Sequence, residues 1–185
     1  MSTPQPVIPD LPSLLTLFCP SEESVGVFEE VSASQLPDFY RRLLDHHDHM
    51  TVTQESVHNC RVAVEVKQRR LSRQHYERKS VLRSVQGGEV LQYCVVRLRF
   101  RYLDVTVREE IENERIPLGR ILIHHNILRR VQMFALWKIT TGPELCQAFG
   151  LSQPTTTYGR TALIYCNGEP AVELLEIIAP CEAEV

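Results

Sequence analysis

The chain has 185 residues, of which 43% are hydrophobic and 23% are charged, an ordinary composition for a globular protein with one core. The formal net charge of -3 argues against a nonspecific nucleic-acid-binding protein, because neutralising phosphates requires surplus Lys and Arg. The longest apolar runs are far shorter than the ~20 residues of a membrane helix, and the first residues lack the basic start of a signal peptide. We therefore expect a cytoplasmic protein, a monomer or weak oligomer, that binds neither nucleic acid nor membrane.

The cysteines are scattered singly and form no CxxC pair and no Cys/His spacing suited to tetrahedral zinc. Most have apolar neighbours, where cysteine packs as a small hydrophobic residue. We expect reduced thiols and neither a metal nor a cofactor. The six positions are Cys19, Cys60, Cys94, Cys146, Cys166 and Cys181.

The start of the chain is rich in proline. Residues 1–37 contain six of the eleven prolines, which limits regular structure there to one short helix around residues 13–18. The sequence predicts a proline-rich arm over residues 1–36, followed by a single domain over residues 37–185.

The first part of the predicted domain contains a helix and a strand. Phe39, Leu43 and Leu44 fit the apolar face of an amphipathic helix that ends near His49. Residues 60–67 (CRVAVEVK) alternate between apolar and polar side chains, which is typical of a strand.

A hairpin and a helix follow. Residues 76–85 and 89–100 are two β-rich runs, and the turn 86–88 between them contains two glycines that can adopt positive φ. Residues 103–114 predict a surface helix, which stops before Pro117 because a pre-proline residue disfavours helical geometry.

The remaining elements complete an α+β pattern. They are a short helix over 118–125, a strand over 128–137 whose periodicity also allows a helix, a short helix over 144–149, and a hairpin of 158–165 with 171–178. Asn167 and Gly168 are a strong turn signal for that hairpin. Consecutive hairpins without βαβ crossovers predict a mostly antiparallel sheet of about six strands, with helices on one face enclosing an internal ligand site.

The run Asp45, His46, His47, Asp48 and His49 contains enough ligands for a metal ion. Metal sites need a defined geometry, however, and consecutive helix residues point in different directions. A solvated helix end, with histidines near its negative pole, is the simpler interpretation.

Arg78 and Glu176 are candidate buried charges. Arg78 shares one face of its predicted strand with Ser80 and Leu82, and an inward arginine needs a partner, either Glu176 or an anionic ligand. Glu176 lies in the apolar run 174–179, and a carboxylate on the core side is costly to ionise unless it is paired. The alternatives are an exposed Arg78 and an edge strand that leaves Glu176 in water.

The helix predicted after Pro117 is a candidate carboxylate site. Proline pre-sets the first helical turn, and the amides of Leu118 and Gly119 then have no partner within the helix. Such amides bind carboxylates well, although a plain helix start is the alternative.

Several short segments follow one another in a recognisable order between about Pro37 and Pro180. They are 48–51 (DHMT), 76–78, 117–120 (PLGR), Arg130, 158–160 (YGR), 167–170 (NGEP), and Glu176 with Ala179 and Pro180. This ordered set resembles the chorismate pyruvate-lyase family, which shares a fold with the effector-binding domains of some bacterial transcription regulators.

The resemblance implies a cofactor-independent carbon–oxygen lyase that converts chorismate into 4-hydroxybenzoate and pyruvate. It implies that Arg78 and the amides of Met50 and Leu118 hold the ligand carboxylate. Glu176 then meets the ring oxygen opposite, so that Arg78 and Glu176 are the expected catalytic residues. The expected lids are a helix around residues 43–50 and the helix that begins at Leu118.

Two other functions remain open. One is a noncatalytic module that binds a small aromatic acid, as in the related regulator domains. The other is an enzyme of the same fold with a different substrate, which the long connection over residues 138–157 would allow.

Overall fold

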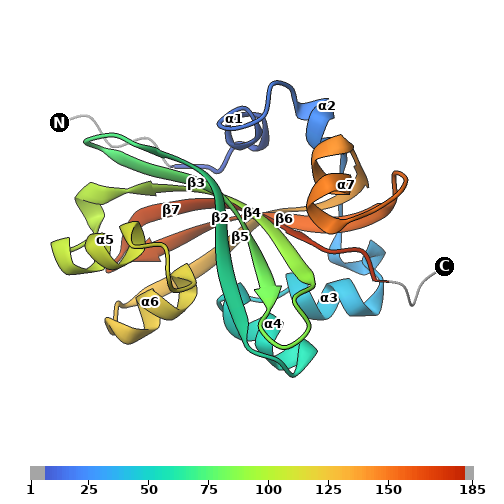
Figure 1. The fold of residues 1–185 in the computed structure, drawn as a ribbon. Coiled ribbons are helices and arrows are strands. Elements are labelled where there is room, and N and C mark those ends of the chain that lie inside the picture. Colours follow the sequence, from blue (N-terminus) through green and yellow to red (C-terminus); the bar gives the residue numbers. More distant parts are fainter. Residues whose placement is uncertain (1–6, 182–185) are drawn as a thin grey trace.

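In the computed structural model, which describes residues 7–181, seven strands form one antiparallel sheet (Figure 1). Their order across the sheet is β1-β5-β6-β7-β4-β3-β2. The strands are β1 (Gly26–Val31), β2 (Val62–Leu71), β3 (His75–Ser84), β4 (Val90–Arg99), β5 (Arg129–Thr141), β6 (Thr156–Cys166) and β7 (Glu169–Ile178). The predicted α+β class and antiparallel sheet are confirmed.

Seven short helices cover the sheet within the described residues. They are α1 (Leu11–Leu15), α2 (Glu22–Val25), α3 (Asp38–Leu44), α4 (Met50–His58), α5 (Val105–Glu112), α6 (Leu118–His124) and α7 (Pro143–Phe149). Figure 1 shows α1, α2 and α7 on one side of the sheet and α3 to α6 on the other. The sequence predicted helices on one face, whereas Leu14, Leu15 and Leu145 also pack over the second face.

Most predicted elements are present. The hairpin between β3 and β4 turns at residues 85–89, where Gly88 has φ 77°. The hairpin between β6 and β7 turns at Asn167 and Gly168, with φ 53° and 87°. The ambiguous segment 128–137 belongs to strand β5, and α5, α6 and α7 lie where they were predicted.

The proline-rich segment contains more structure than predicted. Besides the expected short helix, which is α1, it contains α2 and strand β1. Strand β1 pairs with β5 from Gly26 opposite Thr141 to Val31 opposite Leu136. Pro12 lies in the first turn of α1, where a missing amide is tolerated, and Pro9, Pro20 and Pro37 lie outside these elements. Residues 1–6 of the predicted arm and 182–185 of the predicted domain lie outside the described residues.

The helix predicted to end near His49 ends earlier, so that boundary is wrong, and residues 45–49 form a loop between two helices; the lid expected around residues 43–50 stays a prediction. Helix α3 ends at Leu44, and Asp45 leaves helical geometry with φ -90° and ψ 67°. Helix α4 begins at Met50 after a loop. Its sequence, MTVTQESVH, is mostly polar and has no clear apolar period, which is why it was missed.

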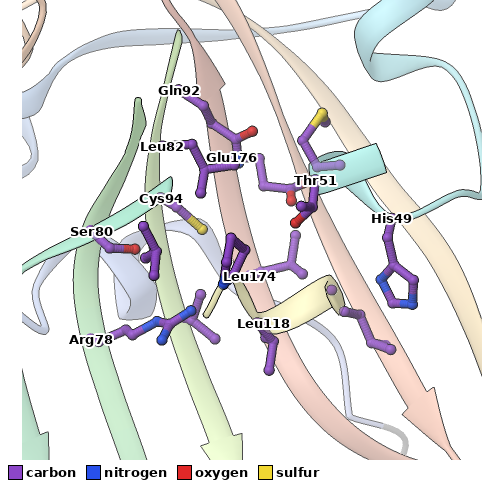
Figure 2. A pocket seen from close by; sticks show the side chains of 16 residues that line it. His49, Thr51, Arg78, Ser80, Leu82, Gln92, Cys94, Leu118, Leu174 and Glu176 are labelled. Carbon is purple, nitrogen blue, oxygen red and sulfur yellow. The ribbon is translucent and has the colours of Figure 1, made fainter. Parts of the chain in front are cut away.

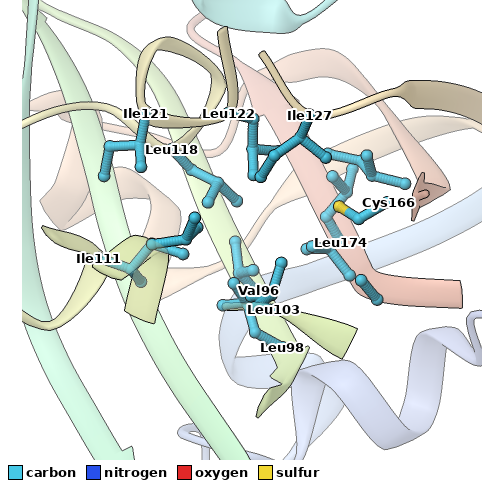
Figure 3. Close-up of a cluster of buried hydrophobic side chains, with 14 of the residues drawn as sticks. Val96, Leu98, Leu103, Ile111, Leu118, Ile121, Leu122, Ile127, Cys166 and Leu174 are labelled. Atoms are coloured by element: carbon cyan, nitrogen blue, oxygen red, sulfur yellow. The ribbon is translucent and has the colours of Figure 1, made fainter. Parts of the chain in front are cut away.

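The largest buried cluster joins α5 and α6 to strands β4, β6 and β7 (Figure 3). Ile111, Ile121 and Leu122 have no exposed surface, and fully burying each such side chain contributes roughly 1.5–3 kcal/mol. This packing fixes the start of α6 above the inner face of the sheet. No helix within residues 7–181 is long and apolar enough to cross a membrane.

Candidate functional site

A cavity lies between the inner face of the sheet and the first turns of α4 and α6 (Figure 2). Its volume is about 50 Å³, which is room for a few water molecules at roughly 10–15 Å³ each. The four residues predicted for the site, Met50, Arg78, Leu118 and Glu176, all line it. The other lining residues are His49, Thr51, Val64, Ser80, Leu82, Gln92, Cys94, Val96, Pro117, Gly119, Ile164 and Leu174.

Strand alternation and register determine which side chains face the cavity. Every second residue of a strand points to the same face, so Arg78 and Ser80 of β3 enter the cavity together. Ser80 pairs with Cys94 of β4, and Cys94 pairs with Glu176 of β7. Arg78 therefore lies two residues along the strands and two strands across the sheet from Glu176, so their Cα atoms are roughly 12 Å apart at about 3.4 Å per residue and 4.8 Å per strand.

Arg78 is a buried charge with incomplete hydrogen bonding. Its exposed fraction is 3%, and neither Nε nor Nη1 has a hydrogen-bond partner within residues 7–181. Burying an unpaired charged donor costs several kcal/mol. The guanidinium is thus in position to receive an anion.

Glu176 is paired with a residue that the sequence did not single out as its partner. Its Oε2 accepts a hydrogen bond of 2.7 Å from Nε of Arg160 on β6, the residue directly opposite it in the sheet. Arg160 also donates to the carbonyl oxygens of Leu44 at 3.1 Å and His46 at 2.9 Å. Of the two partners expected for Arg78, only the anionic ligand remains, because Glu176 is bound to Arg160.

The first turns of α4 and α6 touch at the cavity. A Cβ on Gly119 would lie 3.0 Å from Oγ1 of Thr51 and 3.1 Å from Cβ of His49, so the close approach needs a glycine. Helix α4 begins at Met50, so the amide of Met50 has no acceptor within the helix.

Two titratable groups near Arg78 are held neutral. Burial, with smaller effects of Arg129 and Arg160, lowers the pKa of His49 to about 4. Burial and then the charge of Glu176 raise the pKa of the Cys94 thiol above its ordinary range. The buried pair of Glu176 and Arg160 is neutral as a whole, so Arg78 gives the cavity its net positive charge.

Two of the three histidines in the run 45–49, His46 and His47, make hydrogen bonds, whereas Nε2 of His49 is buried without a partner in the described residues. His46 accepts at Nδ1 from the amide of Asp48 and donates from Nε2 to the carbonyl of Leu43 at 2.7 Å. His47 places Nδ1 3.2 Å from the carbonyl oxygen of Val131. Within residues 7–181 no three His, Cys, Asp or Glu side chains are grouped to hold a metal ion.

Comparison with known proteins finds similarity only among solved structures. No protein-family model and no curated protein matches the chain. PhnF from Mycobacterium smegmatis aligns with a TM-score of 0.55 and 10% identity, over 70% of this chain and 62% of PhnF. The gene product SA0254 from Staphylococcus aureus N315 aligns with a TM-score of 0.55 and 9% identity, over 74% of this chain and 92% of that protein.

A transcriptional regulator of the GntR family from Enterococcus faecalis V583 aligns over 66% of this chain with 8% identity. Its TM-score of 0.47 is too low to support an argument. The chain spans less than two thirds of the length of PhnF. At about 10% identity, the likeness to PhnF and SA0254 shows one thing: the chain shares their α+β fold.

Proposed function

We propose that the cavity binds a small aromatic carboxylic acid and that the chain is a cofactor-independent chorismate pyruvate-lyase-like enzyme. The observation that carries the proposal is Arg78, a buried arginine in the cavity wall with two nitrogens that have no partner. A carboxylate fits the planar guanidinium with two parallel hydrogen bonds.

The cavity also suits the rest of such a ligand. Val96, Leu118 and Leu174 supply apolar walls beside Arg78, where a six-membered ring would lie. Glu176 stands about 7 Å further along the strands and two strands across, roughly 12 Å between Cα atoms; both side chains enter the cavity, and 4-hydroxybenzoate, with a carboxyl and a hydroxyl group at opposite ends of its ring, would bridge them. One molecule of this size can therefore contact both charged groups.

For this reaction the protein needs only to position chorismate and to polarise it. The bond between one ring carbon and the oxygen of the enolpyruvyl group breaks, the neighbouring carbon loses its proton, and the ring becomes aromatic; the released enolpyruvate takes up that proton and becomes pyruvate. Arg78 would hold the ring carboxylate. Glu176, fixed by Arg160, would accept a hydrogen bond from the ring hydroxyl that becomes the phenol.

Ligand entry requires the cavity to widen. A cavity of about 150 Å³ holds benzene, whereas this one measures about 50 Å³. The first turns of α4 and α6 form the side of the cavity opposite the sheet, and their separation would admit the ring.

Incubation with chorismate tests the proposal. We expect wild-type protein to release pyruvate and 4-hydroxybenzoate, and Arg78→Met to lose at least 10- to 100-fold in kcat/KM, since a charge-assisted contact contributes about 1.5–3 kcal/mol. Arg115→Met is the matched control, because Arg115 is exposed. Equal pyruvate release by Arg78→Met and wild type would refute the role of Arg78.

A noncatalytic ligand-binding module is the second candidate. The observation that favours it is the pairing of Glu176, the one carboxylate among the cavity-lining residues, with Arg160 at 2.7 Å, which leaves the cavity without an unpaired carboxyl group for proton transfer. The same experiment separates the two candidates. Arg78-dependent binding of 4-hydroxybenzoate without turnover of chorismate would identify the module.

A further inference from the structure

Two buried glutamines form a pair beyond Glu176: Gln92 lines the cavity at the end away from Arg78, and Gln54 contacts Gln92 without being one of the lining residues. Gln54 of α4 has no exposed surface and Gln92 of β4 is 1% exposed. Nε2 of Gln54 donates to Oε1 of Gln92 at 3.3 Å. Oε1 of Gln54 has no hydrogen-bond partner within the described chain.

The sheet register places this pair on the ligand axis. Arg78 pairs with Val96 of β4, and Gln92 lies four residues before Val96 on the same strand. Glu176 pairs with Cys94, halfway between them. Gln92 lines the cavity and lies near Glu176 in Figure 2. A ligand anchored at Arg78 that extends past Glu176 therefore reaches Gln92.

One polar atom of the pair, Oε1 of Gln54, has no hydrogen-bond partner in the described residues. Two primary amides together offer four N–H donors and two carbonyl acceptors, and one hydrogen bond joins them. The thiol of Cys94 is a further contact of Gln92. A buried acceptor without a partner is unfavourable, so the unpaired oxygen of Gln54 favours a ligand group that donates a hydrogen bond.

We infer that Gln54 and Gln92 form a polar subsite that recognises an uncharged hydroxyl or amide group at the end of the ligand opposite its carboxylate. The inference rests on the proposed carboxylate site at Arg78. A hydroxyl group fits best, because it donates to an amide oxygen and accepts from an amide N–H at the same time. A second carboxylate does not fit, since neither glutamine brings a positive charge.

The test uses two ligands that differ in one terminal group. The first, 4-(2-hydroxyethyl)benzoate, ends in a hydroxyl, and 4-propylbenzoate ends in a methyl of similar size. Calorimetry gives the ratio of their affinities for wild type and for Gln54→Leu/Gln92→Leu. We expect the preference for the hydroxyl ligand to fall roughly 2- to 12-fold in the double variant, the equivalent of one neutral hydrogen bond.

Folding of the double variant is not expected to suffer. Replacing both partners of a buried hydrogen bond with apolar side chains of similar size is close to neutral or stabilising, so its melting temperature should be unchanged or higher. Should it fail to fold, Gln92→Met serves for the same ratio. Gln68→Leu is the matched control, because Gln68 is exposed on β2, and it should keep the wild-type ratio.

The outcomes of this test distinguish the glutamine subsite from the carboxylate site at Arg78. An unchanged ratio, with both ligands still dependent on Arg78, would mean that only water satisfies Gln54; the subsite would then be wrong and the carboxylate site right. If neither ligand binds wild-type protein, the carboxylate site and the subsite are both refuted.

Discussion

Arg78 and Arg160 are both buried, but they differ in how many of their donors have hydrogen-bond partners. Arg160 is 1% exposed and binds Glu176 and the backbone carbonyls of the loop that joins α3 to α4. Arg78 is 3% exposed, and two of its nitrogens have no partner. A buried charge with complete partners holds structure together, whereas one with open donors is kept ready for a ligand at a cost in stability.

The largest expected effect comes from removing Arg160, whose hydrogen-bond partners are complete. Arg160→Met leaves Glu176 as an unpaired buried carboxylate, and such changes cost about 3–5 kcal/mol. We expect a large fall in the melting temperature. Arg115→Met, at an exposed position, should leave it unchanged.

A double variant checks the reason for that loss. Arg160→Met/Glu176→Met removes both charges and should be more stable than Arg160→Met alone, because no unpaired charge remains. If the double variant is no more stable, the loss arises instead from the hydrogen bonds between Arg160 and the loop carbonyls.

Arg78→Met should show the reverse pattern. Because it removes a buried charge without breaking a pair, we expect the stability of the free protein to be unchanged or higher. Affinity for 4-hydroxybenzoate should fall by about 10- to 100-fold, the equivalent of roughly 1.5–3 kcal/mol. Thermal unfolding with and without ligand measures both quantities. If Arg78→Met destabilises the ligand-free protein, Arg78 has a structural role like that of Arg160.

The sequence predicted Arg78 and Glu176 through two separate routes. Strand alternation placed each side chain on the same face as apolar neighbours, and the resemblance joined them in one site. Alternation alone could not tell an inward face from an exposed one, because that depends on which helices cover the sheet. The structure puts both residues in the cavity wall.

Arg160 and Gln54 could not be found in that way. The partner of Arg160 is set by the register between β6 and β7, and its carbonyl contacts depend on where α3 stops. Gln54 lies in a mostly polar sequence that gives no sign of burial, yet it has no exposed surface. Tertiary contacts decide both positions, as they decide the pairing of β1 with the distant β5.

His49 lies in the loop that Arg160 binds, and the pH dependence of folding stability tests whether it is buried. The pKa of His49 is about 4 in the folded protein, below the ordinary value of 6.5. Between pH 6.5 and 4 the unfolded chain therefore binds more protons at this residue, so its contribution makes the folded state less stable as pH falls. The slope is at most about 1.4 kcal/mol per pH unit.

His49→Gln should reduce this pH dependence, as measured by urea unfolding at pH 7 and pH 5. His124→Gln is the control, because His124 is exposed. If His49→Gln and wild type lose the same stability between these two pH values, His49 is not buried in its neutral form.

The smallest effect is expected for Tyr76→Phe. This variant tests whether Tyr76 fixes the position of Arg78, as the loop carbonyls fix that of Arg160. Burial and a hydrogen bond to Glu114 raise the pKa of Tyr76 to about 12. Its hydroxyl donates to Oε1 of Glu114 at 2.7 Å, and losing that bond should cost about 1 kcal/mol of stability. The hydroxyl is also a hydrogen-bond partner of Arg78, but Nε and Nη1 of Arg78, which are open to a ligand, do not bond to it, so ligand affinity should change less than about 3-fold. A tenfold loss of affinity for 4-hydroxybenzoate would instead show that Tyr76 orients Arg78, and the contrast between the two arginines would then be one of degree.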